Sequence, residues 1–265
     1  MSDDRIRNHG RHWADAAVGT VVSVDLAYKR YTDVGIAILS PDPSGALRVR
    51  FVKAASLGLT GAPDPGRLGR ALGSLCGDTQ ASIVLLDGPQ GWKDPWNGLE
   101  HCRICEKHLN APAKTGLPGR VKPATYAPFV HFSIAVFDEF LRCGAHLLSS
   151  DGFGSDHAGL LVLESFPLSA WRGIGIDPLP GKGTSRTRHI HDRCRRLRGL
   201  YKLEVAGDPS HDELQALVAG LAGIAYQRRE RDSFQVSGIA PRIVDGGWRE
   251  GFIVSPVIEP RSRAG

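Results

Sequence analysis

The segment at residues 21–27, VVSVDLA, constrains the fold of this chain more than any other part of its sequence. Its valines are β-branched and apolar, which favours a buried, central β-strand. Asp25 does not suit such a strand, because a buried carboxylate is costly unless a partner or a cation compensates its charge. A correct fold must therefore bring something to Asp25 that offsets this cost.

Composition narrows the class of protein only a little. A chain of 265 residues is long enough for one sizeable core. Its formal net charge of +5 and pI near 9.1 are compatible with a polyanionic partner without requiring one. The 5 cysteines are scattered and odd in number, which argues against a disulfide framework and favours a reduced, cytoplasmic setting. No apolar run approaches the roughly 20 residues of a membrane-spanning helix, and the polar N-terminus has no apolar signal core. We therefore expect a soluble cytoplasmic protein with no membrane partner.

The first half of the chain has the pattern of a mixed sheet. Three apolar segments separated by short polar links predict an antiparallel meander, at residues 18–28, 34–39 and 47–54. A predicted helix at 67–76 leads to a strongly apolar strand at 82–87, and this order predicts a parallel addition to the meander. A further apolar strand is expected at 160–164.

Helical patterns occupy much of the remaining chain. Residues 98–109 and 129–143 are predicted helices, separated by a loop rich in proline and glycine. A basic helix at 184–201 carries one apolar stripe among its arginines. The helix at 214–226 has no charged side chain on any face and should be buried, and the sequence Ser-His-Asp-Glu at 210–213 is a capping box for its start.

These elements predict one α/β domain with attachments. The domain should span residues 18–230, with a helical insertion around 98–145. A polar arm precedes it at 1–17. Residues 231–265 form a C-terminal extension, for which a hairpin around Asp245 is one interpretation.

Four acids stand at the ends of predicted core elements. Asp25, Asp87 and Glu164 lie at or near the ends of three strands, and Asp212 begins the buried helix. In a mixed sheet these side chains can meet at one edge. Two carboxylates about 4 Å apart repel by roughly 4 kcal/mol at an effective dielectric constant near 20. Either some of the four stay protonated, or hard divalent cations such as Mg²⁺ or Mn²⁺ lie between them. Two such ions can activate water and stabilise the leaving oxygen of a phosphodiester.

The order of motifs resembles that of an uncharacterised family of predicted ribonuclease H-like nucleases. The matching segments are VVSVDLA at 21–27, LLDGPQGW at 85–92, RICE at 103–106, LESFP at 163–167 with Trp171 after it, and HDELQALVAG at 211–220. No single motif is specific, so the order and spacing carry the resemblance, which covers roughly residues 20–228.

The resemblance implies a fold and a chemistry. The fold is ribonuclease H-like: a mixed five-stranded sheet, with three antiparallel strands plus parallel additions, flanked by helices. The chemistry is metal-dependent cleavage of nucleic acid, DNA or RNA, with two Mg²⁺ or Mn²⁺ ions. Asp25, Asp87, Glu164 and Asp212 would be the catalytic ligands, and Asp25 would bridge both ions.

Each acid also has a purely structural explanation. Asp25 could cap a turn, and Asp87 before Gly-Pro could form an Asx-type turn. Glu164 could pair with an arginine of the basic helix. Asp212 is favourable at a helix N-terminus without any metal. Only the combination in this order predicts a shared site.

Four basic residues are candidates for contact with nucleic acid. Arg103 lies in the RICE segment and is expected either to contact phosphate or to brace one of the acids. Lys182, Arg186 and Arg188 begin the densest basic segment, which could follow a phosphate backbone. The alternative for this segment is an ordinary solvated helix face.

Other functions are less well supported by the sequence. Cys102 and Cys105 form a single CxxC, with His101 and His108 nearby, and a structural zinc site would need further ligands from distant segments. A non-catalytic module that binds nucleic acid or protein on the same fold is the main alternative to a nuclease. A nucleotide-binding phosphotransferase ranks last, because the glycine-rich phosphate hairpins are missing.

Overall fold

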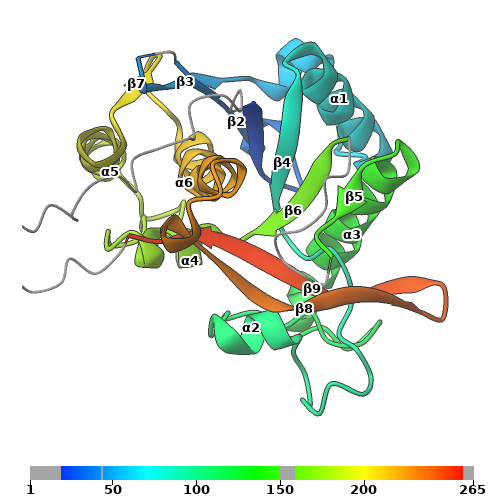
Figure 1. Cartoon of the computed structure of the whole chain (residues 1–265). Coiled ribbons are helices and arrows are strands. Elements are labelled where there is room, and N and C mark those ends of the chain that lie inside the picture. The colour runs from blue at the N-terminus through cyan, green and yellow to red at the C-terminus, as the bar shows by residue number, and fades with distance from the viewer. Residues whose placement is uncertain (1–18, 43, 150–158, 259–265) are drawn as a thin grey trace, which may run out of the picture.

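The computed structural model describes residues 19–42, 44–149 and 159–258. The expected polar arm at 1–17 lies outside the described residues. The strands are β1 (Thr20–Asp25), β2 (Gly35–Pro41), β3 (Leu47–Phe51), β4 (Ala81–Asp87), β5 (His146–Leu147), β6 (Leu161–Ser165), β7 (Leu203–Val205), β8 (Phe234–Val244) and β9 (Gly247–Pro256). They form one sheet in the order β7-β3-β2-β1-β4-β6-β9-β8, with β5 beside β6 (Figure 1).

Helices cover both faces of this sheet. The α-helices are α1 (Pro65–Asp78), α2 (Ile104–His108), α3 (Ala127–Arg142), α4 (Pro167–Gly173), α5 (Thr187–Tyr201) and α6 (His211–Gln227). Single 3-10 turns occupy η1 (Tyr31–Asp33), η2 (Ala54–Leu57), η3 (Ala124–Tyr126) and η4 (Arg231–Ser233). Helices α1 and α3 lie on one face, and α4, α5 and α6 lie on the other (Figure 1). None of the described helices is long and apolar enough to cross a lipid bilayer.

The central strands have the directions expected of a ribonuclease H-like fold. Strand β1 is antiparallel to β2, and β2 is antiparallel to β3. Strand β4 is parallel to β1, and β6 is parallel to β4. The mixed α/β fold predicted from the sequence is therefore confirmed.

The sheet is larger than the five strands predicted. Strands β5 and β7 have only 2 and 3 residues, which is too short for an alternating pattern to show in the sequence. The hairpin β8–β9 joins the same sheet through the pairing of β9 with β6 and projects from the molecule (Figure 1). The predicted helix at 98–109 is shorter than expected and begins only at Ile104. The segment before it is a turn, in which the Asn97 side chain donates to the carbonyl of Cys102 at 3.0 Å.

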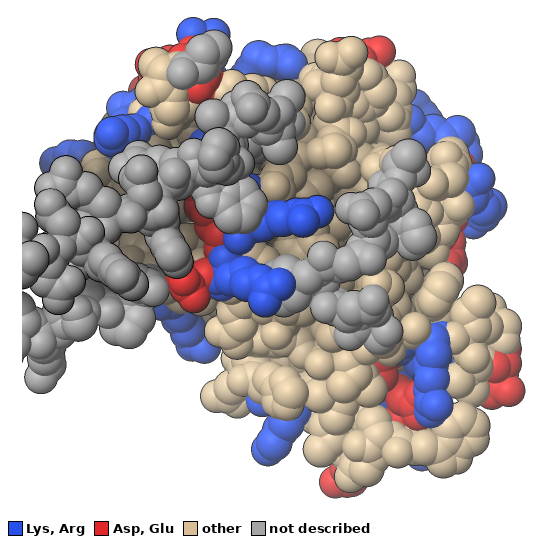
Figure 2. All heavy atoms as spheres, in the orientation of Figure 1, with Lys and Arg blue, Asp and Glu red and all other residues tan. Residues whose placement is uncertain are grey.

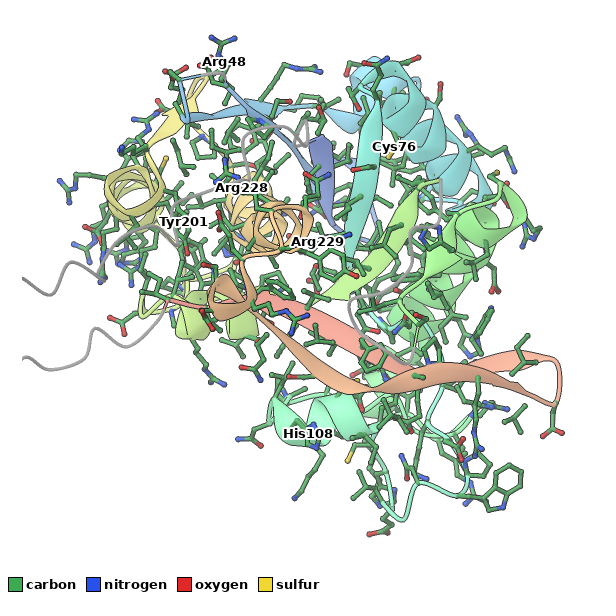
Figure 3. The ribbon with its side chains drawn as sticks, in the orientation of Figure 1. Arg48, Cys76, His108, Tyr201, Arg228 and Arg229 are labelled. Carbon is green, nitrogen blue, oxygen red and sulfur yellow. The ribbon has the colours of Figure 1, made fainter. Side chains whose placement is uncertain are left out.

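Two separate cores hold the layers together. Alternate residues of β1 and β4 point to opposite faces, so that Val21 and Leu85 pack under α6 while Val22 and Val84 pack under α1 and α3. Cys76 of α1 belongs to the second core and lies on the side of its helix that faces the sheet (Figure 3).

Helix α6 lies unusually close to the sheet. A Cβ atom at Gly220 would come within 2.7 Å of Leu39, and one at Gly223 would come within 2.6 Å of Leu85. A third glycine, Gly35 at the start of β2, touches the other end of the contact: a Cβ there would lie 2.1 Å from the carbonyl oxygen of Asp212. These glycines bring the N-terminus of α6 directly to the edge where β1 ends.

Candidate functional site

Asp25 and Asp87 lie side by side at the carboxyl ends of β1 and β4. They are partners in the parallel register of these two strands. Counting by twos from Val21 and Leu85, which belong to the core under α6, places both carboxyl groups on the α6 face of the sheet. The expectation that these two acids meet at one edge agrees with this geometry.

The surroundings of the pair favour protonation. Burial raises the pKa of Asp25 well above its usual range, and the neighbouring charge of Asp87 raises it further. Burial also raises the pKa of Asp87 to about 7, while its hydrogen bond with Asp25 acts in the opposite direction. Asp25 therefore carries a proton that Asp87 accepts, and at neutral pH the pair holds less than its full negative charge.

Asp212 approaches the pair from α6. Gly35 is the register partner of Asp25 on β2 and touches the backbone of Asp212. Both carboxylate oxygens of Asp212 already have partners. One accepts from the ammonium group of Lys182, and the other lies 3.1 Å from Nδ1 of His211. Asp212 is thus placed next to Asp25, with its charge balanced by neighbouring cations.

Glu164 is oriented differently from the other three acids. It is the register partner of Leu86, and Val162 before it on the same side of β6 packs under α1 and α3. Its side chain is 3% exposed and accepts two hydrogen bonds from Arg103, at 2.6 and 2.7 Å. The backbone N–H of Gln90 donates a third at 2.9 Å. Burial nevertheless raises the pKa of Glu164, although Arg103 opposes this.

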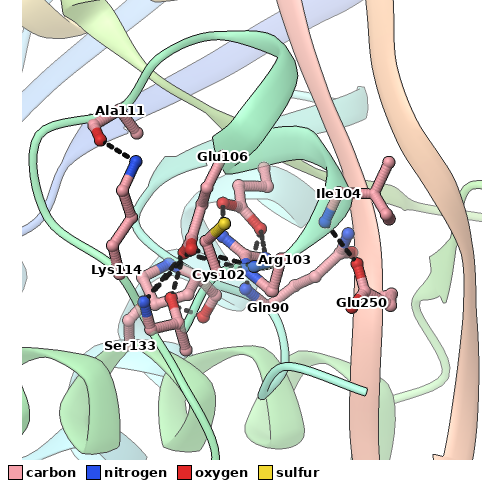
Figure 4. Close-up of polar contacts among 12 residues, drawn as sticks. Gln90, Cys102, Arg103, Ile104, Glu106, Ala111, Lys114, Ser133 and Glu250 are labelled. Carbon is pink, nitrogen blue, oxygen red and sulfur yellow. Dashed lines mark hydrogen bonds and ion pairs between the residues drawn. The ribbon is translucent and has the colours of Figure 1, made fainter. Parts of the chain in front are cut away.

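Arg103 is the centre of a buried ionic network, shown in Figure 4. Its Nε donates to Glu106 at 3.1 Å, while its two terminal nitrogens hold Glu164. Glu106 also accepts from the backbone and hydroxyl of Thr115. With its side chain 2% exposed, Arg103 offers no surface to a phosphate. Of the two roles expected from the sequence, its contacts are those of an arginine that braces an acid.

The other basic candidates lie on the opposite side of the acids, around the start of α5. Lys182 bridges Asp212 and Asp33, the latter at 2.7 Å. Arg186 is the N-cap residue of α5, and Arg188 is in its first turn; both are exposed. On the face seen in Figure 2, lysines and arginines gather at several separate places. The site is therefore defined by its carboxylates more than by a basic groove.

Few groups in the described residues are arranged for a metal ion. Within residues 19–42, 44–149 and 159–258, no three His, Cys, Asp or Glu side chains converge as a ligand set. Cys105 is buried in the protein and Cys102 is partly buried, while His108 lies at the end of α2 (Figure 3). The residues best placed to hold a cation are the pair Asp25 and Asp87, because Mg²⁺ is usually bound by one or two carboxylates together with waters and substrate phosphates.

A cavity of about 180 Å³ adjoins Asp87 at the ends of β4 and β6. Ser165 and Tyr126 line it, and neither was a candidate in the sequence. The register supplies the signal that was missed: Ser165, and not Glu164, is the residue of β6 that pairs with Asp87 and faces α6.

Comparison with known proteins gives structural similarity only. No family model matches the chain, and neither does any curated protein. RuvC of Thermus thermophilus is similar over 78% of this chain and 94% of its own, with 14% identity and a TM-score of 0.39. The yeast mitochondrial Holliday junction resolvase is similar over 83% of this chain and 84% of its own, with 11% identity and a TM-score of 0.40. T. thermophilus RuvC in complex with a Holliday junction substrate gives 78%, 94%, 13% and 0.36. Similarity at this level carries no argument about activity, for which the carboxylates are the basis.

Proposed function

We propose that this protein is a divalent-metal-dependent nuclease that hydrolyses phosphodiester bonds of nucleic acid. It would belong with the uncharacterised predicted nucleases that its motifs resemble. The observation that carries the proposal is the register pairing of Asp25 with Asp87 on neighbouring parallel strands, with raised pKa values.

The donor set of this pair fits Mg²⁺ or Mn²⁺. Both ions prefer carboxylate oxygen, and a cation between Asp25 and Asp87 would remove the repulsion that the shared proton now relieves. Asp212 is the natural third ligand, since Gly35 holds its backbone against the end of β2. When bound, such an ion would neutralise charge on the phosphate and increase the acidity of water.

Glu164 is better explained as a positioning residue than as a ligand. Its oxygens are held by Arg103 and by the N–H of Gln90, which follows β4 by three residues. This network fixes the loop directly after Asp87 and so fixes the direction of that carboxylate. The proposed ligand set is therefore Asp25, Asp87 and Asp212, without the fourth acid expected from the sequence.

The cationic residues would serve the substrate. Lys182 lies against Asp212 with its side chain 48% exposed, and its ammonium group is free to turn toward a phosphate when Asp212 takes up another partner. Arg186 and Arg188 extend this positive charge along α5 and would hold the backbone of the nucleic acid.

Hydrolysis of defined oligonucleotides tests the proposal. We expect cleavage of single-stranded, duplex or hybrid substrates in Mn²⁺, and at least a hundredfold loss in Asp25→Asn. Asp245→Asn, the same chemical change on the exposed hairpin tip, is the matched control and should cleave normally. Equal activity of wild type and Asp25→Asn would refute the assignment.

A non-catalytic binding module is the second candidate. The observation in its favour is that Asp212 and Glu164 are already neutralised by Lys182 and Arg103. A module of this kind would bind nucleic acid without cleaving it, and the binding would be unchanged by a chelator and by Asp25→Asn.

A further inference from the structure

The cavity beside Asp87 is too small for a cofactor and too well formed to be a surface dent. Its volume of about 180 Å³ lies below the roughly 300–1,000 Å³ of typical sites for drug-sized ligands. At about 30 Å³ for each water molecule, it holds a volume of about six waters, which is enough for a single small ring system. Apolar side chains form much of the wall, from Pro89, Pro112, Phe166 and Ile253.

Ser165 gives this cavity an unused hydrogen-bonding group. The residue is 1% exposed, and its Oγ is buried with no hydrogen-bond partner among the described residues. Buried hydroxyl groups are nearly always paired, because leaving one unpaired forfeits its interaction with water. Ser165 lines the cavity and is the register partner of Asp87, so a ligand that satisfies the hydroxyl lies beside the proposed metal ligands.

The charge of the lining decides what kind of ligand fits. Three carboxylates line the cavity, from Asp87, Glu106 and Glu164, against the single guanidinium group of Arg103. A phosphate would be repelled. A neutral, flat molecule with amino or imino donors suits the carboxylate and hydroxyl oxygens, and the phenol ring of Tyr126 adds an aromatic surface.

We propose that this cavity receives one unstacked nucleobase of the substrate, next to the phosphodiester held at Asp25 and Asp87. The inference rests on the proposed nuclease function and narrows its substrate. A base can enter the cavity only when it is neither paired nor stacked, so the preferred substrate contains an unpaired nucleotide at the cleavage site. Uninterrupted duplex must pay the additional free energy of flipping a base.

Nucleoside binding tests the cavity without requiring cleavage. The four ribonucleosides, and ribose as a probe without a base, are titrated into the full chain in EDTA and followed by ligand-observed NMR. We expect at least one nucleoside to bind at least tenfold more tightly than ribose. Ser165→Ala and the cavity-filling Ala113→Trp should each weaken that binding by tenfold or more.

Two matched controls make this result specific. Ser23→Ala removes another buried, unpartnered hydroxyl, which is outside the cavity, and Ala206→Trp adds the same ring at an exposed position after β7. Both should bind like the wild type. Equal binding of ribose and nucleosides, or equal effects of Ser165→Ala and Ser23→Ala, would overturn the inference and leave a cavity filled only by water.

Cleavage then separates the inference from the function on which it rests. Single-stranded oligonucleotides with one abasic residue at successive positions should lose cleavage at least tenfold at one position relative to the abasic residue. Cleavage that is indifferent to the abasic residue, or equal on uninterrupted duplex, would overturn the base cavity while the nuclease stands. If no substrate is cleaved, the nuclease proposal fails, and the nucleoside titration alone decides whether the cavity binds a base.

Discussion

At the scale of single residues, Asp25 and Asp87 share one proton across the β1–β4 pair in the metal-free protein. Two other acids of the same edge are neutralised by side chains instead, Asp212 by Lys182 and Glu164 by Arg103. Each acid therefore has a local answer to the burial of its charge. Only the Asp25–Asp87 answer depends on pH.

The shared proton predicts how stability changes with pH. Because the pKa of Asp87 is raised from 3.8 to about 7, the folded protein binds more protons than the unfolded chain between these values. Its free energy of unfolding in EDTA should therefore fall as the pH rises from about 4 to about 7, by an amount of the order of 4 kcal/mol from about 1.4 kcal/mol per pKa unit.

Urea unfolding at a series of pH values measures this slope. Asp87→Asn lacks the titrating group, so its stability should vary less over the same range and exceed that of the wild type above pH 7. Asp245→Asn, on the hairpin tip, should follow the wild type. Parallel curves for wild type and Asp87→Asn would show that the proton is not held where the geometry places it.

At the scale of elements, the distance between α6 and the sheet determines where Asp212 lies. Gly220 and Gly223 remove the side chains that would separate the helix from β1, β2 and β4. The helix is buried over nearly its whole length, which agrees with the absence of charged side chains between 214 and 226. A small displacement of this helix would move Asp212 away from Asp25.

Gly223→Ala tests this close packing. Alanine is the better helix former by about 1 kcal/mol, but its methyl group would lie 2.6 Å from Leu85 and 2.8 Å from Val21. We expect a net loss of about 1–3 kcal/mol from overpacking. Gly73→Ala in α1, where a Cβ meets nothing within 4 Å, should instead stabilise by about 0.5–1 kcal/mol. Thermal or urea unfolding of both variants gives the comparison, and a stabilising Gly223→Ala would contradict the packing argument.

The sequence predicts the central elements well and their edges poorly. Strong apolar runs at β1 and β4 and the capping box at Ser210 identify the core strands and α6, because each has a local signal of its own. The direction of a side chain at a strand end depends on register, which the sequence does not contain. Glu164 and Ser165 are neighbours in sequence, but only the pairing of β6 with β4 decides which of them faces Asp25.

At the scale of the whole molecule, the C-terminal hairpin is part of the architecture that supports the site. Strand β9 pairs with β6 at Ile253, which also lines the cavity beside Asp87. Glu250 is fully buried and accepts from the backbone of Asp94 and of Ile104, at 3.0 and 2.8 Å. The hairpin therefore holds the segment that presents Arg103 to Glu164.

Removing the hairpin should unfold this half of the protein. A chain ending at Arg229 would expose the edge of β6 and leave the partners of Glu250 unpaired, so we expect no cooperative unfolding transition. As a control, replacing residues 243–248 by Asn-Gly shortens only the projecting tip and keeps the pairing of Arg242 with Arg249. That variant should unfold cooperatively, as the wild type does. A cooperative transition in the truncated chain would show that the hairpin is dispensable.

The contact between Lys182 and Asp212 has a consequence for how the protein is made and supplied. Since an ammonium group of the chain already balances this acid, and a proton balances Asp25 and Asp87, newly synthesised chains can reach the folded state in a cell that is short of divalent metal. Scarcity would then leave a store of intact, unloaded molecules rather than losses to degradation. Such a store becomes active as soon as the supply of the ion recovers, without new synthesis.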